Sequence, residues 1–288
     1  MRDSSFADPF VVMGIVNVTP DSFSDGGRYV HAPAAIAHGL ALEADGAGIL
    51  DVGGESTRPG AEPVSRVDEL ARVVPVIEGL RAAGTRARIS IDTSKAAVAR
   101  AALAAGADMV NDVTALRGDP EMADVVAEHR VDCCLMHMLG EPRTMQRDPH
   151  YDDVVDDVAA FLSARMAFAT SRGVAADRIL LDPGIGFGKT DAHNLELLAR
   201  LGELAALGRP IVIGTSRKSF LGRITGRAVD DRLAATVATN VLAYERGARV
   251  FRVHDAGPIH DALMIAAATV RPPWPSTTPT NTTTTPTT

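Results

Sequence analysis

Short apolar runs recur eight times along the chain, and segments with the periodicity of amphipathic helices separate them. The runs are residues 10–16, 48–52, 87–91, 108–112, 131–137, 178–182, 210–214 and 248–253. They are rich in β-branched and long aliphatic residues without strict polar alternation, which is typical of parallel strands covered on both faces. Among the intervening segments, residues 34–44, 66–83, 95–105 and 194–207 carry apolar positions at helical spacing. The pattern predicts a repeated strand–helix unit.

Glycine marks three junctions between a helical segment and the apolar run that follows. Gly46, Gly106 and Gly247 stand where a glycine can adopt the left-handed conformation that ends a helix. Eight such units fit a closed barrel or a long doubly wound sheet, and the length and regular spacing favour the barrel. We therefore predict one α/β domain, a (β/α)8 TIM barrel over residues 10–270, with long loops after strands 1 and 2 at its C-terminal face.

Composition adds limits to this picture. Residues 1–9 are expected to be an N-terminal extension, and the Pro- and Thr-rich residues 271–288 a disordered tail. The net charge of −7 lacks the basic excess of a nucleic-acid binder. No stretch approaches the roughly 20 apolar residues of a membrane span. Cys133 and Cys134 are neighbours that cannot easily form a disulfide, so we expect a reducing, cytoplasmic location and no membrane partner.

Polar side chains stand at or just beyond the end of every predicted strand. They are Asn17, Asp51, Asp92, Asn111, His137, Asp182, Ser216, Lys218, Arg252 and His254. Any one of them, taken alone, is more often a turn former or helix cap than a functional group. In a closed barrel the whole set converges on one mouth, where carboxylates and carboxamides can grip the donors and acceptors of a heterocycle.

Basic residues near this predicted mouth suit an anion. Arg252 and His254 are two residues apart and therefore lie on the same side of a strand, while Arg58 follows a flexible Gly-Gly pair in the second loop. Together they offer a pocket for a diphosphate. The alternative for Arg252 is an ion pair with Asp51 or Asp255.

Three other motifs are rejected. The glycine-rich segment 182–190 fails the P-loop pattern at Pro183 and the dinucleotide pattern at Lys189. Cys133 and Cys134 should point to opposite faces of a strand, which leaves too few ligands for zinc. Ser216 and Ser219 lack a base nearby in the sequence, so no Ser-His-Asp triad is predicted.

Several long segments resemble the dihydropteroate synthases in that family's order. They are MGIVNVTPDSFSDGG, DVGGESTRPGAEPVS, SIDTSK, VNDV, GEPRTMQ, LDPGIGFGK, GTSRKSF and RVHD, and the resemblance covers about residues 10–270. It implies a (β/α)8 barrel that condenses a dihydropterin diphosphate with 4-aminobenzoate to give 7,8-dihydropteroate in folate biosynthesis. It also implies a Mg²⁺ ion, a cytoplasmic homodimer and a place among the targets of sulfonamides.

The same resemblance implies a set of site residues. The pterin site falls on Asp92, Asn111, Asp182 and Lys218. The diphosphate site falls on Asn17, Thr57, Arg58, Arg252 and His254, with Asn17 also next to Mg²⁺. The 4-aminobenzoate site falls on Phe23, Ser56, Thr57, Pro59, Phe187, Lys218 and Ser219. The catalytic residues are Asp92, Asp182, Lys218, Arg252 and His254.

Two rival interpretations and one ambiguity stay open at this point. A methyltetrahydrofolate methyltransferase would share the carboxylate-based pterin site but would need no diphosphate pocket. A non-catalytic paralogue would keep the fold and bind a pterin or a partner without turnover. Val237, Val241 and Leu242 have a spacing that suits either a dimer face or packing within the chain.

Overall fold

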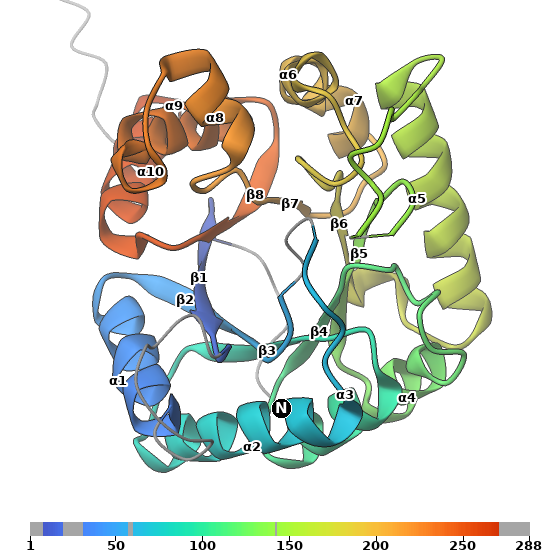
Figure 1. The fold of residues 1–288 in the computed structure, drawn as a ribbon, viewed down its shortest axis with the longest axis vertical. Coiled ribbons are helices and arrows are strands. Elements are labelled where there is room, and N and C mark those ends of the chain that lie inside the picture. The colour runs from blue at the N-terminus through green and yellow to red at the C-terminus, as the bar shows by residue number, and fades with distance from the viewer. Residues whose placement is uncertain (1–7, 20–30, 57–59, 142, 271–288) are drawn as a thin grey trace, which may run out of the picture.

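The strands close into one parallel barrel (Figure 1). The computed structural model describes residues 8–19, 31–56, 60–141 and 143–270. The strands are β1 (Val11–Asn17), β2 (Ala47–Gly53), β3 (Arg88–Asp92), β4 (Met109–Asp112), β5 (Asp132–Met136), β6 (Ile179–Asp182), β7 (Ile211–Ile213) and β8 (Ala248–Val253). Each predicted run overlaps one of them. Because β1 pairs with both β2 and β8, the barrel is closed and the doubly wound sheet is excluded.

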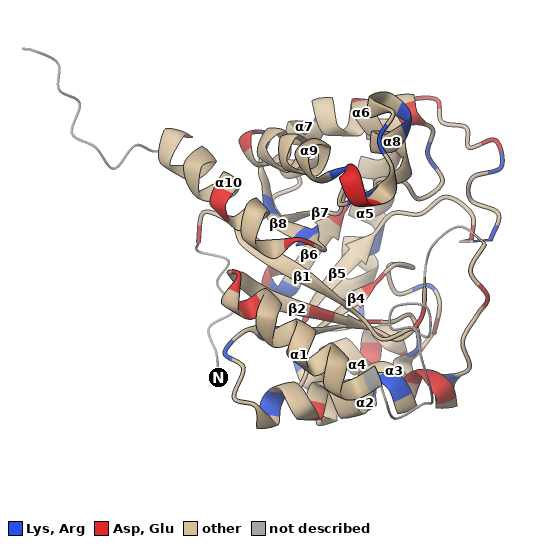
Figure 2. Cartoon of the chain, turned by 60° about the vertical axis from the view of Figure 1, so that its left-hand side comes forward, with Lys and Arg blue, Asp and Glu red and all other residues tan. Residues whose placement is uncertain are grey.

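Helices surround the barrel and connect successive strands. They are α1 (His31–Ala44), α2 (Arg66–Ala82), α3 (Ala96–Ala104), α4 (Met122–His129), α5 (Val154–Ser171), α6 (Asp191–Ala199), α7 (Leu201–Ala205), α8 (Ser219–Thr225), α9 (Leu233–Glu245) and α10 (Ala256–Val270). Short 3-10 turns occupy Ala176–Arg178 and Val229–Asp231. Figure 2 shows charges of both signs interspersed along these helices and the loops between them.

The helical segment predicted over residues 194–207 is not one continuous helix. The segment 194–207 forms α6 and α7, with a break at Arg200, whose backbone leaves the helical region at φ −103° and ψ 20°. Leu197 and Leu201 on either side of the break are both fully buried, so the apolar spacing continues through it. The Arg200 guanidinium is held at the break by ion pairs that include Asp153 at 2.7 Å. The apolar periodicity of the sequence therefore predicted correctly which residues are buried, but it did not predict the break in the helix.

Local sequence sets several helix ends. The Ser65 side chain caps α2, and Thr190 forms a capping box with His193 at the start of α6. At the opposite ends, Gly46, Gly106 and Gly247 have φ values of 95°, 114° and 105°. The left-handed conformation predicted at these junctions is confirmed.

The barrel interior is filled by an apolar layer below the mouth. It consists of Met13, Ile49, Met109, Cys134, Leu180, Val212 and Val250. A larger apolar cluster lies between the strands and the surrounding helices, and it contains Cys133. The adjacent cysteines thus point to opposite faces of β5, as predicted. Within the described residues, no helix has the length and apolar character needed to cross a membrane.

Candidate active site

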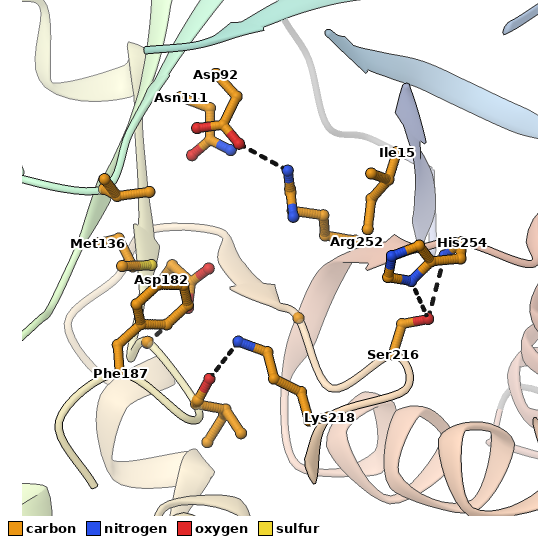
Figure 3. A pocket seen from close by; sticks show the side chains of 14 residues that line it. Ile15, Asp92, Asn111, Met136, Asp182, Phe187, Ser216, Lys218, Arg252 and His254 are labelled. Atoms are coloured by element: carbon orange, nitrogen blue, oxygen red, sulfur yellow. Dashed lines mark hydrogen bonds and ion pairs between the residues drawn. The ribbon is translucent and has the colours of Figure 1, made fainter. Parts of the chain in front are cut away.

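The carboxyl ends of the strands surround one cavity at the barrel mouth (Figure 3). Its lining comprises Ile15, Asp92, Asn111, Val113, Met136, Asp182, Gly184, Ile185, Phe187, Gly214, Ser216, Lys218, Arg252 and His254. The free space, including the open mouth, amounts to about 500 Å³. Seven polar residues that the sequence placed at the ends of five strands therefore meet, as do the apolar side chains that can flank a flat ring.

Two buried carboxylates occupy this cavity. Asp92 ends β3 and Asp182 ends β6, and each is less than a tenth exposed. Asp182 Oδ1 accepts a 2.7 Å hydrogen bond from the backbone N–H of Gly184. Burial raises the pKa of Asp182, against the lowering effects of that hydrogen bond and of Lys218. Burial likewise raises the pKa of Asp92, against the lowering effect of Arg252.

Arg252 is bound by two carboxylates on neighbouring strands. Its Nε donates to Asp51 Oδ2 over 2.6 Å, and its Nη2 donates to Asp92 Oδ2 over 2.8 Å. Asp51 Oδ2 also accepts a 3.1 Å hydrogen bond from Asn111 Nδ2. Of the two ion-pair partners weighed for Arg252, Asp51 is the one observed. Asp255 pairs instead with Arg217, at 2.5 Å.

Asp51 is a member of this network that does not line the cavity. The residue is fully buried, and its Oδ1 has no hydrogen-bond partner among the described residues. Its role in fixing Arg252 and Asn111 could not be read from the sequence, because Asp51 and Arg252 are 201 residues apart. What the sequence did indicate was that Asp51 stands at the end of a predicted strand.

Lys218 projects into the cavity from the turn between β7 and α8. Its Nζ donates to the backbone carbonyl of Ile185 over 2.7 Å and lies 4.1 Å from the centroid of the Phe187 ring. Burial lowers the pKa of Lys218 to about 8, against the raising effect of Asp182. The ammonium group is therefore held over the cavity by a carbonyl and an aromatic face.

Ser216 and His254 form a pair that the sequence analysis missed. His254 Nδ1 lies 2.9 Å from Ser216 Oγ, and Oγ accepts a 3.1 Å hydrogen bond from the His254 backbone N–H. The hydroxyl can either donate its proton to Nδ1 or accept one from it, according to the tautomer of the ring. The pair fixes the orientation of the imidazole at the cavity. It does not make a catalytic triad, because the neighbouring carboxylate of Asp255 is engaged by Arg217.

The remaining predicted site residues divide into two groups. Phe23, Thr57, Arg58 and Pro59 lie outside the described residues. Asn17, Ser56 and Ser219 are described but do not line the cavity. Asn17 ends β1 beside Gly53 of β2, which places it next to the start of the second loop. Ser219 is exposed at the first residue of α8.

The chemistry of Asn17 is compatible with Mg²⁺. Its half-buried carboxamide makes no hydrogen bond with the described part of the chain, so its oxygen is available as a hard ligand. The described residues contain no cluster of three or more His, Cys, Asp or Glu side chains suited to a metal. This donor set fits an ion that keeps most of its ligands as water and substrate phosphate oxygens.

Fold and site together define a (β/α)8 barrel enzyme with a deep polar pocket for a flat heterocycle. The model of the pterin binding enzyme family matches residues 13–254. A dihydropteroate synthase from Synechocystis is 46% identical over 258 residues, which cover 89% of each chain.

Solved structures agree with this assignment. A Xanthomonas albilineans dihydropteroate synthase with 4-aminobenzoic acid is 52% identical, with a TM-score of 0.86, over 91% of this chain and 94% of that one. A structure from the same organism in complex with 7,8-dihydropteroate is 48% identical, with a TM-score of 0.84, over 93% and 96%. The chain belongs to the dihydropteroate synthase family. This result decides against the methyltransferase interpretation.

Proposed function

We propose that the cavity at the barrel mouth binds the dihydropterin diphosphate and that 7,8-dihydropteroate forms there from 4-aminobenzoate. The observation that carries this proposal is the meeting of two carboxylates, a carboxamide, a lysine, an arginine and a histidine in one cavity. Solved relatives that hold 4-aminobenzoic acid and 7,8-dihydropteroate support it.

The pterin ring lies across the floor of the cavity in this proposal. Asp182 Oδ1 keeps a second lone pair beside its bond to Gly184, so both oxygens of the ionised carboxylate can accept donors from the guanidine-like edge of the ring. Lys218 donates to the oxo group or a ring nitrogen. Asn111 and Asp92 complete the polar contacts, while Ile15, Met136 and Phe187 supply apolar walls.

The diphosphate lies nearer the mouth. Arg252 and His254 face the cavity from β8 and the residue after it, and Asn17, Thr57 and Arg58 are the further residues proposed to hold the anion. Mg²⁺ bound at Asn17 would neutralise charge on the leaving diphosphate. Because Asp51 and Asp92 already balance part of the charge of Arg252, the anion needs these additional positive groups.

The reaction joins the amine nitrogen of 4-aminobenzoate to the exocyclic methylene carbon of the pterin. The bond between that carbon and the diphosphate oxygen breaks, and the amine loses one proton. Departure of the anion leaves positive charge on the pterin, which the carboxylates of Asp92 and Asp182 stabilise. No covalent enzyme intermediate is required.

The second substrate is proposed to enter above the pterin. Phe187 offers an aromatic wall, and Lys218 and Ser219 stand on the same side of the mouth. The further residues proposed for this site are Phe23, Ser56, Thr57 and Pro59. This site is also where a sulfonamide would compete.

A cytoplasmic homodimer is the proposed form of the enzyme. On α9, Leu242 is 44% exposed, whereas Val237 and Val241 are partly buried against the core of the same chain. Packing within the chain therefore accounts for two of these three residues. Leu242 is the one proposed for a dimer face.

The test is diphosphate release by the purified protein with Mg²⁺ and the dihydropterin diphosphate, with and without 4-aminobenzoate. Dihydropteroate, identified by mass, is expected from the wild type and from Arg100→Met, which alters only a surface ion pair with Glu128. Lys218→Met is expected to lose most of the activity. Pterin binding by the wild type without any product would instead support a non-catalytic paralogue.

A further inference from the structure

Lys189 is among the largest of the fully buried side chains in the described structure. It follows the glycine-rich loop after β6, and only 2% of its surface is exposed. Its Nζ lies 2.9 Å from His137 Nδ1, donates to the carbonyl of Phe187 over 3.1 Å, and stands 5.9 Å from the centroid of the Tyr151 ring. A lysine is rarely buried to this extent unless its ammonium group is paired or hydrogen-bonded.

The contacts of Lys189 join two loops at the back of the cavity. The loop 183–188 lies flush against the end of β5, where a Cβ on Gly184 would stand 1.9 Å from the His137 carbonyl oxygen. A Cβ on Gly188 would similarly stand 2.5 Å from the carbonyl oxygen of Leu139. Such close backbone approach needs glycine, and the bond from Lys189 to His137 holds the loop in that position.

The loop that Lys189 holds carries two contacts of the active site. Ile185 presents the carbonyl that accepts the Lys218 ammonium group, and Phe187 presents its ring to the same group. Because Lys189 donates to the Phe187 carbonyl, its side chain fixes the loop at the residue that forms the proposed wall for 4-aminobenzoate.

Lys189 also acts electrostatically on Asp182. Asp182 and Lys218 are the charged groups that affect Lys189, and Lys189 and Arg117 are those that affect His137. Burial lowers the pKa of His137 to about 3, so the ring is neutral and its Nδ1 accepts from Lys189. Burial lowers the pKa of Lys189 to about 7, against the raising effect of Asp182. When charged, Lys189 lowers the pKa of Asp182.

We propose that Lys189 is a positioning residue of the pterin pocket, which holds loop 183–188 against β5 through His137 and adds a positive charge to the surroundings of Asp182. The inference rests on the proposed function, since it assumes that Asp182 receives the pterin. It assigns to the final lysine of the LDPGIGFGK segment a role distinct from that of Lys218.

The test measures the affinity of 6-hydroxymethylpterin by calorimetry from mildly acidic pH to neutrality. This probe lacks the diphosphate and therefore the phosphate ionisation near pH ~6. Lys189→Met keeps the length of the side chain and removes its charge. Because the charge of Lys189 is present at low pH and lowers the pKa of Asp182, the ratio of wild-type to variant affinity is expected to grow as pH falls.

Two further variants separate charge from position. His137→Phe keeps an aromatic ring that can pack edge-to-face on Phe161 but removes the hydrogen-bond acceptor of Lys189. It is therefore expected to raise the KM for 4-aminobenzoate, while the affinity for the pterin keeps the pH dependence of the wild type. Arg223→Met breaks an exposed pair with Asp191 and is expected to match the wild type at every pH. Circular dichroism confirms that each variant is folded.

An affinity ratio for Lys189→Met that is the same at every pH would overturn the electrostatic part of the inference. An unchanged KM for 4-aminobenzoate in a folded His137→Phe would overturn the positional part. Failure of the wild type itself to bind the pterin would instead contradict the proposed function. If Lys189→Met does not fold, Lys189→Gln provides the same neutral comparison with a polar end.

Discussion

The barrel contains two layers of inward-facing side chains that differ sharply, although they come from the same strands. The pairs, two residues apart, are Ile49 and Asp51, Met109 and Asn111, Leu180 and Asp182, and Val250 and Arg252. The first member of each pair packs in a dry apolar cluster, and the second carries a polar or charged group. One strand period therefore separates the part of the barrel that stabilises it from the part that binds a ligand.

The polar layer is held in place at the expense of stability. Burial raises the pKa of Asp92 and Asp182, which means that the folded protein disfavours their charged forms. The apolar layer contains no carboxylate. Substitutions in the upper layer should therefore affect activity first, and substitutions in the lower layer should affect folding first.

The largest effect is expected from Asp182→Asn. Loss of the charged acceptor should reduce kcat/KM for the dihydropterin diphosphate about 1,000-fold, which corresponds to roughly 4 kcal/mol. Steady-state kinetics measures this change. The variant should be at least as stable as the wild type at neutral pH in urea unfolding. A clear loss of stability would contradict the claim that the polar layer serves binding and the apolar layer serves stability.

The sign of the stability effect follows from the pKa of Asp182. Because that pKa is higher in the folded than in the unfolded state, the folded protein binds more protons between the two values. The stability of the wild type therefore falls as pH rises through this window. Asp182→Asn should lack that contribution.

Leu180→Ala tests the lower layer of the same strand. Removing a fully buried side chain should lower the free energy of unfolding by about 3 kcal/mol through lost burial and a residual cavity. Urea unfolding by circular dichroism measures the loss. In the folded variant, kcat/KM is expected to stay within about threefold of the wild type, and a much larger fall would show that the layers are coupled.

Asp51→Asn separates support of the polar layer from contact with the ligand, because Asp51 belongs to the polar layer without lining the cavity. The substitution keeps an oxygen for Arg252 and Asn111 but removes the charge that pairs with Arg252. We expect a loss of about 2 kcal/mol in unfolding free energy, since a buried cation loses one of its two partners. Thermal unfolding measures the change, and a gain in stability would contradict a structural role for Asp51.

The smallest expected effect is the dependence of kcat/KM on pH. Burial lowers the pKa of Lys218 to about 8, so its positive charge is progressively lost above that pH. The kcat/KM for the dihydropterin diphosphate should therefore decline on the alkaline side. Lys218→Arg should keep its charge and move the decline to higher pH, although with lower activity, and an unmoved decline would assign the ionisation to another group.

Much of the fold and part of the site could be predicted from the sequence. The eight strands were found because each is a short apolar run, and the helix ends at Gly46 and Gly106 because backbone conformation there demands glycine. The meeting of Asp92, Asn111 and Asp182 followed from barrel geometry once the strand ends were known. The family resemblance added their roles, which remain proposals.

What the sequence did not predict are contacts between distant segments. Asp51 and Arg252, Ser216 and His254, and His137 and Lys189 each lie far apart in the chain, and no local periodicity encodes which partner a polar side chain selects. The burial of Lys189 was equally hidden, because a lysine after a glycine-rich loop is expected to be solvated.

A crystal structure of the protein grown with 6-hydroxymethylpterin tests the pterin site most directly. We predict that the ring lies in the cavity of Figure 3, with its guanidine-like edge on Asp182 and its oxo group or ring nitrogen within hydrogen-bond distance of Lys218 Nζ. A pterin bound elsewhere, or bound in the cavity without contact to Asp182, would contradict the claim that the polar layer forms the pterin site.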